Sequence, residues 1–190
     1  MIYIFIGPSS SGKDTFYKYA LEQYNLNPIV LHTTRPMRDG EEEGKSYFFI
    51  TKEEMDQLEK DGKLIERRDY DTKYGVWSYA TCISSIDLHK KYIVMNTWEG
   101  YQKYLDYFKN QNRILPIYFK LDKGVRLERA IAREKMQKEP KYDELCRRFI
   151  ADSIDYSDEL LEKYAPVIID NNGTIEETKE QLDKVFKLVK

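Results

Sequence analysis

Short apolar runs alternate along the chain with stretches in which apolar residues recur every three or four positions. The apolar runs predict buried strands at residues 1–6, 29–32, 92–95, 113–121 and 166–170. The three-to-four spacing predicts helices at 13–24, from 51 to about 60, from 96 to about 110, at 125–133, at 142–164 and from 174 to near the end. This alternation predicts an α/β fold of three layers, a parallel central sheet covered by helices on both faces.

Local signals refine three of these elements. The sequences Thr51–Glu54 and Thr174–Glu177 each predict a capping box at a helix start. Pro116 lies inside the strand at 113–121 and predicts a bulge or an edge position, since proline cannot donate to a sheet ladder. The apolar face of the last helix is predicted to consist of Ile175, Leu182, Val185, Phe186 and Val189.

Two polar stretches interrupt the alternation and predict the domain organisation. Residues 33–86 contain several glycines and only a short β-like run at 46–50, so we expect an inserted substrate lobe. Residues 134–146 are rich in Lys and Glu between two arginine-bearing helices, so we expect a mobile lid. The core domain is then made of residues 1–32, 87–133 and 147–190.

The composition fits one globular domain with a full core, since 41% of the 190 residues are hydrophobic and 34% are charged. A net charge of −2 argues against a nucleic-acid partner, and no apolar run approaches the about 20 residues of a membrane span. The N-terminus lacks the features of a signal peptide. We therefore expect a cytoplasmic monomer or homodimer without a nucleic-acid or membrane partner.

The rare residue types narrow the chemistry. Cys82 and Cys146 lie far apart, without metal-ligand spacing, and are expected to be reduced. His32 and His89 are the only histidines, which disfavours a histidine-based triad or a histidine-rich metal site.

A glycine-rich stretch directly follows the first strand and precedes the first helix. That context is typical of a phosphate-binding loop, in which backbone N–H groups and the helix N-terminus face phosphate oxygens and a lysine reaches the β- and γ-phosphates. We predict that this phosphate loop binds ATP through Gly7, Pro8, Ser9, Ser10, Ser11, Gly12, Lys13, Asp14 and Thr15.

Asp14 is unusual, because the residue after the lysine of such a loop is normally Ser or Thr, whose hydroxyl binds Mg²⁺. The carboxylate can itself bind Mg²⁺, it can simply cap the helix, or its charge can repel ATP. We favour the first interpretation, with Thr15 still offering a hydroxyl.

The segment from Thr33 to Phe49, TTRPMRDGEEEGKSYFF, predicts a second phosphate site. Arg35 and Arg38 are three residues apart and can clamp one dianionic phosphate through charge-assisted hydrogen bonds, to which Tyr47 can add a hydroxyl. A solvated charge run has no need of the proline and glycines found in the same stretch.

The chain resembles the guanylate kinase family over nearly its whole length. The similar segments are the phosphate loop, the T-T-R-x-x-R-x-G-E-x-x-G-x-x-Y segment, residues 64–66, Tyr74-Gly75, the lid and residues 167–171. The resemblance implies a P-loop fold and transfer of phosphate from ATP, with Mg²⁺, to GMP. It implies that the catalytic residues are Lys13, Arg35, Arg38, Arg129, Arg133 and Arg148. It also implies that GMP is bound by Arg35, Arg38, Tyr47, Glu66, Tyr74, Asn96 and Thr97.

Within this resemblance, Glu66 is the carboxylate that accepts from the guanine ring N–H and amino group. Leu31, Val76 and Asn96 depart from the family pattern at polar positions, where the usual residues are a serine, a Ser or Thr and an acid. Asp14 compensates for the missing acid if it binds Mg²⁺.

Two alternatives to a GMP kinase remain open. Leu31, Val76 and Asn96 favour a kinase of the same fold that uses another nucleotide or a phosphorylated sugar. A non-catalytic scaffold that binds phosphorylated partners is the other alternative, and the intact phosphate loop with Lys13 argues against it. No N-K-x-D motif is present, so a GTPase switch is disfavoured.

Overall fold

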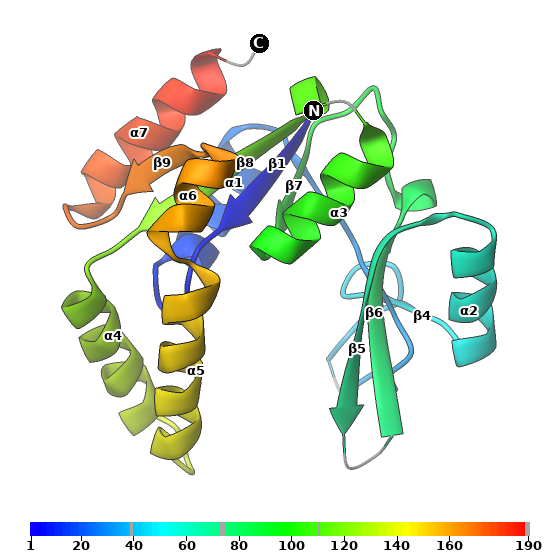
Figure 1. The fold of residues 1–190 in the computed structure, drawn as a ribbon, viewed down its shortest axis with the longest axis horizontal. Coiled ribbons are helices and arrows are strands. Elements are labelled where there is room, and N and C mark those ends of the chain that lie inside the picture. The colour runs from blue at the N-terminus through cyan, green and yellow to red at the C-terminus, as the bar shows by residue number, and fades with distance from the viewer. Residues whose placement is uncertain (39, 73–74, 110, 189–190) are drawn as a thin grey trace.

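The computed structural model of the chain describes residues 1–38, 40–72, 75–109 and 111–188 (Figure 1). Within these residues, five parallel strands form the central sheet in the order β2-β7-β1-β8-β9. They are β1 (Ile2–Ile6), β2 (Asn27–Pro28), β7 (Tyr92–Met95), β8 (Ile114–Lys120) and β9 (Val167–Asp170). The predicted parallel central sheet is confirmed.

Helices cover both faces of this sheet, because alternate residues of each strand are buried against opposite layers. On β1, Ile2, Ile4 and Ile6 pack with α3 (Trp98–Phe108) and α6 (Asp158–Tyr164), whereas Tyr3 and Phe5 pack with α1 (Lys13–Gln23) and α7 (Ile175–Leu188). Each fully buried large apolar side chain stabilises the fold by about 1.5–3 kcal/mol. The result is the three-layer arrangement that the sequence predicts.

A second, four-stranded sheet lies beside the central one and has the order β4-β3-β6-β5. Its elements are β3 (His32–Thr33), β4 (Phe48–Phe49), β5 (Leu64–Thr72) and β6 (Gly75–Cys82), with α2 (Lys52–Lys60) before β5 and the short 3-10 helix η1 (Ile83–Ser85) after β6. The capping box predicted at Thr51–Glu54 is confirmed at the start of α2.

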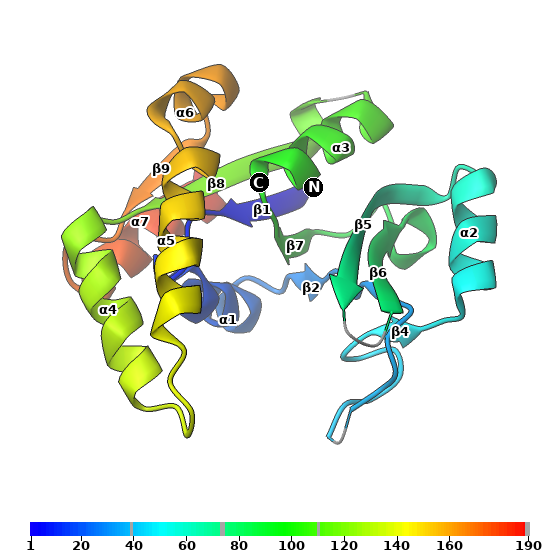
Figure 2. The same ribbon diagram turned by 60° about the horizontal axis from the view of Figure 1, so that its bottom comes forward.

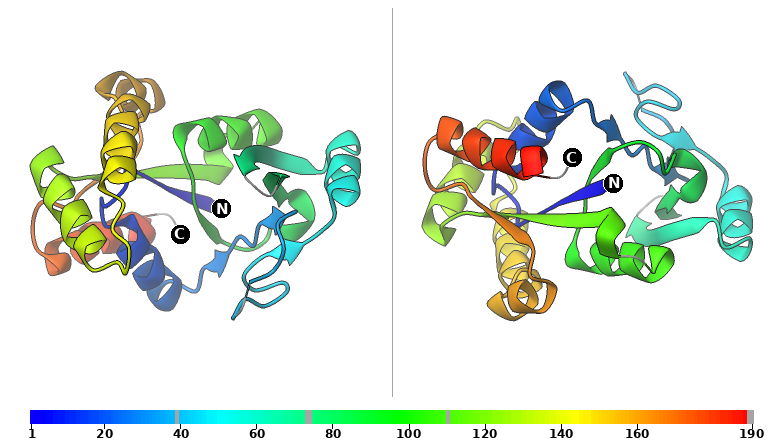
Figure 3. Two further views of the ribbon diagram at one scale, coloured as in Figure 1. Left: turned by 90° about the horizontal axis from the view of Figure 1, so that it is seen from below. Right: turned by 90° about the horizontal axis from the view of Figure 1, so that it is seen from above.

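Two helices, α4 (Lys123–Lys135) and α5 (Tyr142–Asp155), project from the central sheet and pack against each other. Figures 2 and 3 show this pair on one side of α1 and the four-stranded sheet on the other side. The phosphate loop at the start of α1 therefore lies between two projecting parts of the molecule. The exact boundaries of lobe, core and lid stay a prediction.

Two predicted elements are wrong. No strand spans residues 29–32: Ile29 N still bonds Ile93 O of the central sheet, after which the chain crosses to the other sheet, where His32 pairs with Ala80. The predicted helix at 142–164 is two helices, because Tyr156 leaves helical geometry and Ser157, at the N-cap position of α6, is extended. The Ser157 side chain makes no capping hydrogen bond, but two acids in the next turn favour such a new start.

Two further details differ from expectation. β8 pairs with β1 without a register shift, so Pro116 forms no bulge. β8 also lies inside the sheet and not at its edge. Its other neighbour, β9, pairs with it only from Ile117 onward, which leaves one flank of Pro116 without a neighbouring strand. On α7, Leu182 and Phe186 are buried as predicted, but Ile175 is exposed, and Val189 lies outside the described residues.

The short 3-10 helix η2 (Gln111–Arg113) precedes β8. No described helix has the length and apolarity needed to cross a membrane.

Candidate functional site

The phosphate loop joins the C-terminal end of β1 to α1 in a conformation that requires glycine at its last turn. Gly12 adopts φ 88° in the left-handed region, and a Cβ atom there would overlap Asn171 Nδ2. Asn171 is buried at the end of β9 and donates to Ser11 O at 2.8 Å, while Thr178 Oγ1 donates to Asn171 Oδ1 at 3.0 Å. These bonds from β9 and α7 fix the shape of the loop, and the sequence analysis did not assign them.

Lys13 lies over its own loop, where Nζ donates to Pro8 O at 3.1 Å. Burial lowers the pKa of the Lys13 ammonium, the carboxylates of Asp14 and Asp152 raise it, and the guanidinium groups of Arg133 and Arg126 lower it further. The charges of four residues from α1, α4 and α5 thus act on the Lys13 ammonium. Such a cluster is suited to bind a polyanion, whose charge offsets the mutual repulsion of the cations.

Two loop hydroxyls have no partner. The Oγ atoms of Ser10 and Ser11 are buried and make no hydrogen bond among the described residues. Buried hydroxyls without partners are costly in a folded protein, so their presence fits a loop that receives acceptor oxygens from a ligand. Phosphate oxygens are such acceptors.

Arg126 and Asp152 are functional candidates that the sequence analysis missed. Asp152 Oδ2 accepts from Ser9 N at 2.8 Å and from Arg126 Nη1 at 3.3 Å, and the two side chains are only 3% (Arg126) and 14% (Asp152) exposed. The Arg126 guanidinium also lies 4.3 Å from the centre of the Phe149 ring. The pair ties α5 to α4 and to the phosphate loop.

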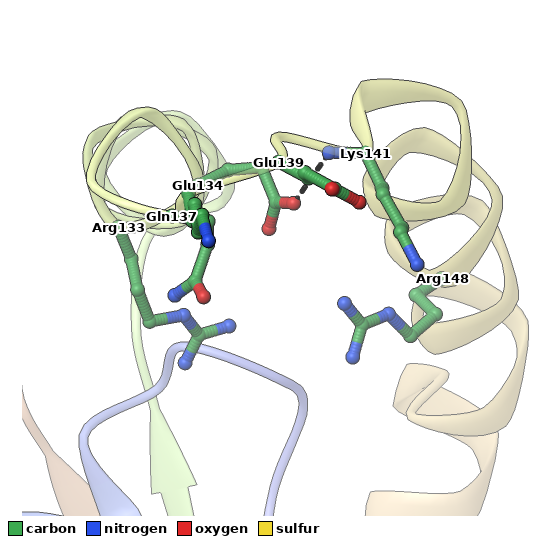
Figure 4. Close-up of a pocket in the computed structure, with 7 residues that line it drawn as sticks. Arg133, Glu134, Gln137, Glu139, Lys141 and Arg148 are labelled. Atoms are coloured by element: carbon green, nitrogen blue, oxygen red, sulfur yellow. Dashed lines mark hydrogen bonds between the residues drawn. The ribbon is translucent and has the colours of Figure 1, made fainter.

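Arg133 and Arg148 line one pocket of about 580 Å³ between α4 and α5. Figure 4 shows the two side chains approaching each other from the two helices, above the N-terminal loop drawn in blue. Arg148 Nε lies 3.6 Å from Glu144, which Arg147 holds through two 2.7 Å bonds. Arg129 is exposed on α4 and does not line this pocket, so the structure brings together only two of the three predicted lid arginines.

Asp14 and Thr15 are exposed in the first turn of α1. In the described part of the chain, no group of three or more His, Cys, Asp or Glu side chains is arranged to hold a metal. Mg²⁺ bound with a nucleotide usually takes one or two carboxylates, phosphate oxygens and water. Asp14 therefore fits an ion that arrives with a nucleotide, and its role stays a prediction.

On the acceptor side, Arg35 is buried and already paired. Both of its terminal nitrogens bond the Glu41 carboxylate, and its guanidinium lies 4.9 Å from the centre of the Tyr47 ring. This pair raises the pKa of Arg35 and lowers that of Glu41 to about 2. Arg38 is exposed, and Tyr74 lies outside the described residues. The structure thus brings Arg35 and Tyr47 together, with Glu41 orienting the arginine.

Glu66 is 4% exposed and points toward the carboxyl end of β7. Its Oε1 accepts from Asn96 Nδ2 at 2.9 Å and from Thr81 Oγ1 at 3.2 Å, and Tyr104 donates to Thr81 at 3.2 Å. Its Oε2 is buried and has no hydrogen-bond partner among the residues that the structure describes. A buried carboxylate oxygen without a donor is the arrangement expected where a ligand supplies one.

Asn96 and Thr97 meet the start of α3. Thr97 Oγ1 accepts from Gly100 N at 3.2 Å, so this hydroxyl caps the helix, and Asn96 Oδ1 accepts from Thr97 N at 2.9 Å. Asn96 therefore contacts Glu66 directly, whereas Thr97 positions Asn96.

Comparison with known proteins decides the family. The sequence profile described as Guanylate kinase matches residues 1–188. The chain belongs to the guanylate kinase family. The guanylate kinase of Oceanobacillus iheyensis is 43% identical over 75 residues, which are 39% of this chain and 36% of that protein. That of Legionella pneumophila (strain Lens) is 34% identical over 104 residues, 52% of this chain and 48% of that protein.

These matches span less than half of the length of each relative. A crystal structure of guanylate kinase from Anaplasma phagocytophilum has the same fold, with a TM-score of 0.61 over 99% of this chain and 85% of that chain at 21% identity. Membership of the guanylate kinase family confirms the predicted fold class, while the residue roles rest on the geometry above.

Gly100 offers a test of the contact between Asn96 and Glu66. A Cβ atom at position 100 would overlap the Asn96 side-chain amide. We expect Gly100→Ala to displace this amide and to lower kcat/KM for the acceptor by about 10-fold or more, as for loss of a hydrogen bond to a charged group. Steady-state kinetics check this. Gly124→Ala, in the first turn of α4 and without a left-handed φ, controls for replacement of a glycine at a helix start. An unchanged kcat/KM in Gly100→Ala would contradict the positioning.

Proposed function

We propose that the chain transfers a phosphoryl group from ATP to GMP and forms ADP and GDP. The observation that carries the proposal is the buried Glu66, held by Asn96 and Thr81 with one carboxylate oxygen lacking a donor. Guanine presents two adjacent donors, N1–H and the 2-amino group, to such a carboxylate. Family membership and the phosphate loop support the same reaction.

On the donor side, the loop from Gly7 to Thr15 binds the triphosphate. Its N–H groups and the hydroxyls of Ser10 and Ser11 donate to phosphate oxygens, and Lys13 exchanges its bond with Pro8 for the β- and γ-phosphates. Asp14 and Thr15 would hold the Mg²⁺ that accompanies ATP. When bound, this ion neutralises phosphate charge during transfer.

On the acceptor side, Arg35, Arg38 and Tyr47 bind the phosphate of GMP. Arg35 is held by Glu41 before the ligand arrives, which reduces the entropy lost on binding. Arg133 and Arg148 share a pocket, and approach of α4 and α5 to the loop would bring both onto the migrating phosphoryl group and exclude water. This chemistry needs no protein nucleophile, since positioning and charge neutralisation suffice.

One chain supplies all these residues, so a monomer or a homodimer can perform the reaction. The proposed setting is the cytoplasm, and the partners are small nucleotides.

A kinase for another nucleotide is the second candidate. The observation that favours it is the apolar Leu31 in the wall of a pocket next to Tyr47, where the family resemblance predicts a hydroxyl. A panel of nucleoside monophosphates separates the two candidates.

We expect the wild-type chain to release ADP fastest with GMP when ATP and Mg²⁺ are supplied. A coupled assay with GMP, IMP, AMP, UMP and CMP measures this. Lys13→Met should abolish turnover with every acceptor, because the cation on the transferring phosphates is lost, whereas Lys18→Met on the exposed side of α1 should retain it. Faster turnover with another acceptor would replace GMP in the proposal, and the absence of turnover with all five would contradict it.

A further inference from the structure

Arg68 lies beside Glu66 on β5. It follows Glu66 by two residues on β5, so both side chains point to the same face of the sheet. Arg68 Nη2 is 3.6 Å from Glu66 Oε1, its side chain is 26% exposed, and its Nε is buried without a hydrogen-bond partner in the described part of the chain. A guanidinium whose Nε lacks a described partner thus lies next to a carboxylate whose Oε2 lacks one.

The surroundings of Arg68 form a pocket of about 360 Å³. It is lined by Leu31, Tyr47, Arg68, Tyr70, Trp77 and Tyr79. Among these lining residues, Arg68 alone carries a formal charge, and four of the others are aromatic. Flat rings are suited to pack against a planar base, and the arginine then supplies polar recognition within an otherwise apolar or hydroxyl-bearing wall.

Glu66 and Arg68 side by side offer a hydrogen-bond acceptor followed by donors, and this order complements the hydrogen-bonding edge of one purine base. The carboxylate accepts, and the neighbouring guanidinium donates. Guanine presents the complementary order, with the donors of the 2-amino group and N1–H followed by the acceptor O6. Adenine presents the opposite order there, with a donor at its 6-amino group and an acceptor at N1. Adenine would therefore place its 6-amino donor against the Arg68 donors and its N1 acceptor against the Glu66 carboxylate.

We propose that Arg68 is a base-recognition residue that donates to the 6-oxo group of the acceptor nucleotide. This inference rests on the proposed function and goes beyond it, because it names the residue that reads the 6-position. Arg68 thereby takes a polar contact that the apolar side chain of Leu31 cannot make. It also disfavours adenine through the unpaired donors that an adenine would leave in a buried site.

The preceding residue provides a matched control. Arg67 points to the opposite face of β5, where it bonds Asp56 and Glu59 of α2, each at 2.8 Å, and Asp69 at 2.9 Å. These bonds join the strand to the helix and do not involve the pocket. Arg67→Met therefore removes an arginine from the same strand without touching the proposed base contact.

The test compares GMP with 6-thioguanosine 5′-monophosphate, which keeps the 2-amino group and the N1–H and replaces the 6-oxo group by sulfur, a much weaker hydrogen-bond acceptor. In the wild-type chain, kcat/KM should favour GMP. Arg68→Met should lower kcat/KM for GMP by about 10- to 100-fold, the value of one or two hydrogen bonds to a charged group, and change it little for the analogue. Arg67→Met should leave the ratio of the two values unchanged. Thermal unfolding of each variant reports its folding.

Three outcomes would overturn the inference. Unchanged kcat/KM for both nucleotides in a folded Arg68→Met would show that Arg68 does not contact the base. Equal losses with both nucleotides would show that Arg68 only holds Glu66 or the phosphate. If the wild-type chain turns over neither GMP nor the analogue, the proposed function fails together with this inference. If the wild-type chain acts on GMP but Arg68→Met leaves the ratio of the two kcat/KM values unchanged, only the Arg68 inference fails. Should Arg68→Met fail to fold, Arg68→Gln is measured in the same way, with the same loss of ratio expected.

Discussion

Replacement of Glu66 by glutamine should lower kcat/KM for GMP by about 10²- to 10³-fold while the protein remains folded. Glutamine keeps the shape of the side chain and one oxygen that can accept from Asn96. Its amide nitrogen, however, replaces a carboxylate oxygen and would point a donor at the donors of guanine. The site is 4% exposed, so water cannot restore the lost pairing.

IMP provides the internal comparison for this variant, because hypoxanthine lacks the 2-amino group and has one donor fewer to lose. The penalty of Glu66→Gln should therefore be smaller with IMP than with GMP. Glu53→Gln, on the exposed surface of α2, is the control for loss of a carboxylate in the same part of the chain. Equal kcat/KM values for Glu66→Gln and wild type would remove Glu66 from the base site.

The central sheet was predictable because its signals are local. β1 and β7 are continuous apolar runs that are buried on both faces, and the phosphate loop combines a strand, glycines, a lysine and a helix start within a few residues. The strand predicted at 29–32 is wrong because the prediction also used a local signal. An apolar run does not reveal which of two sheets it joins. There the partner of His32 is Ala80, far along the chain.

Candidate site residues can be proposed from the sequence only where a motif marks them, and their roles stay predictions. Lys13, Arg35 and Glu66 belong to such motifs. Arg68 does not, because its proximity to Glu66 is meaningful only once the pocket is known. The resemblance also favours Arg129, which does not line the pocket that Arg133 and Arg148 share, and its role stays a prediction.

The sequence does contain one signal that marks Arg126. Arg126 and Arg133 are seven residues apart, which is about two helical turns, so they share a face of α4. Asp152 could not be found in this way, since its pairing with Arg126 depends on how α4 packs against α5.

The ion pair between Arg126 and Asp152 should be the most sensitive contact for stability. Removing one partner leaves a buried charge, so Asp152→Ala and Arg126→Met should each lower the free energy of unfolding by about 3–5 kcal/mol. For a chain of this size, that lowers Tm by about 10 °C. The double variant should lose much less than the sum, because neither charge is left alone. Chemical denaturation of the four proteins measures the coupling energy.

The exposed pair of Arg147 and Glu144 is the matched control, since both residues lie on α5 and are well exposed. Breaking it should change the free energy of unfolding by no more than about 1 kcal/mol. Additive losses for Arg126 and Asp152 would contradict the pairing.

Asp152 also connects this stability to nucleotide binding, because its carboxylate rests on Ser9 N of the phosphate loop. Asp152→Asn keeps an acceptor for that N–H and removes a negative charge close to where the triphosphate binds. We expect it to tighten ATP binding by about 5-fold, the effect of roughly 1 kcal/mol of repulsion, even as stability falls. Calorimetric titration with ATP measures the change. Weaker ATP binding in this variant would instead mean that the pair between Asp152 and Arg126 holds the loop in its binding shape, and that its contribution to loop order exceeds its charge repulsion.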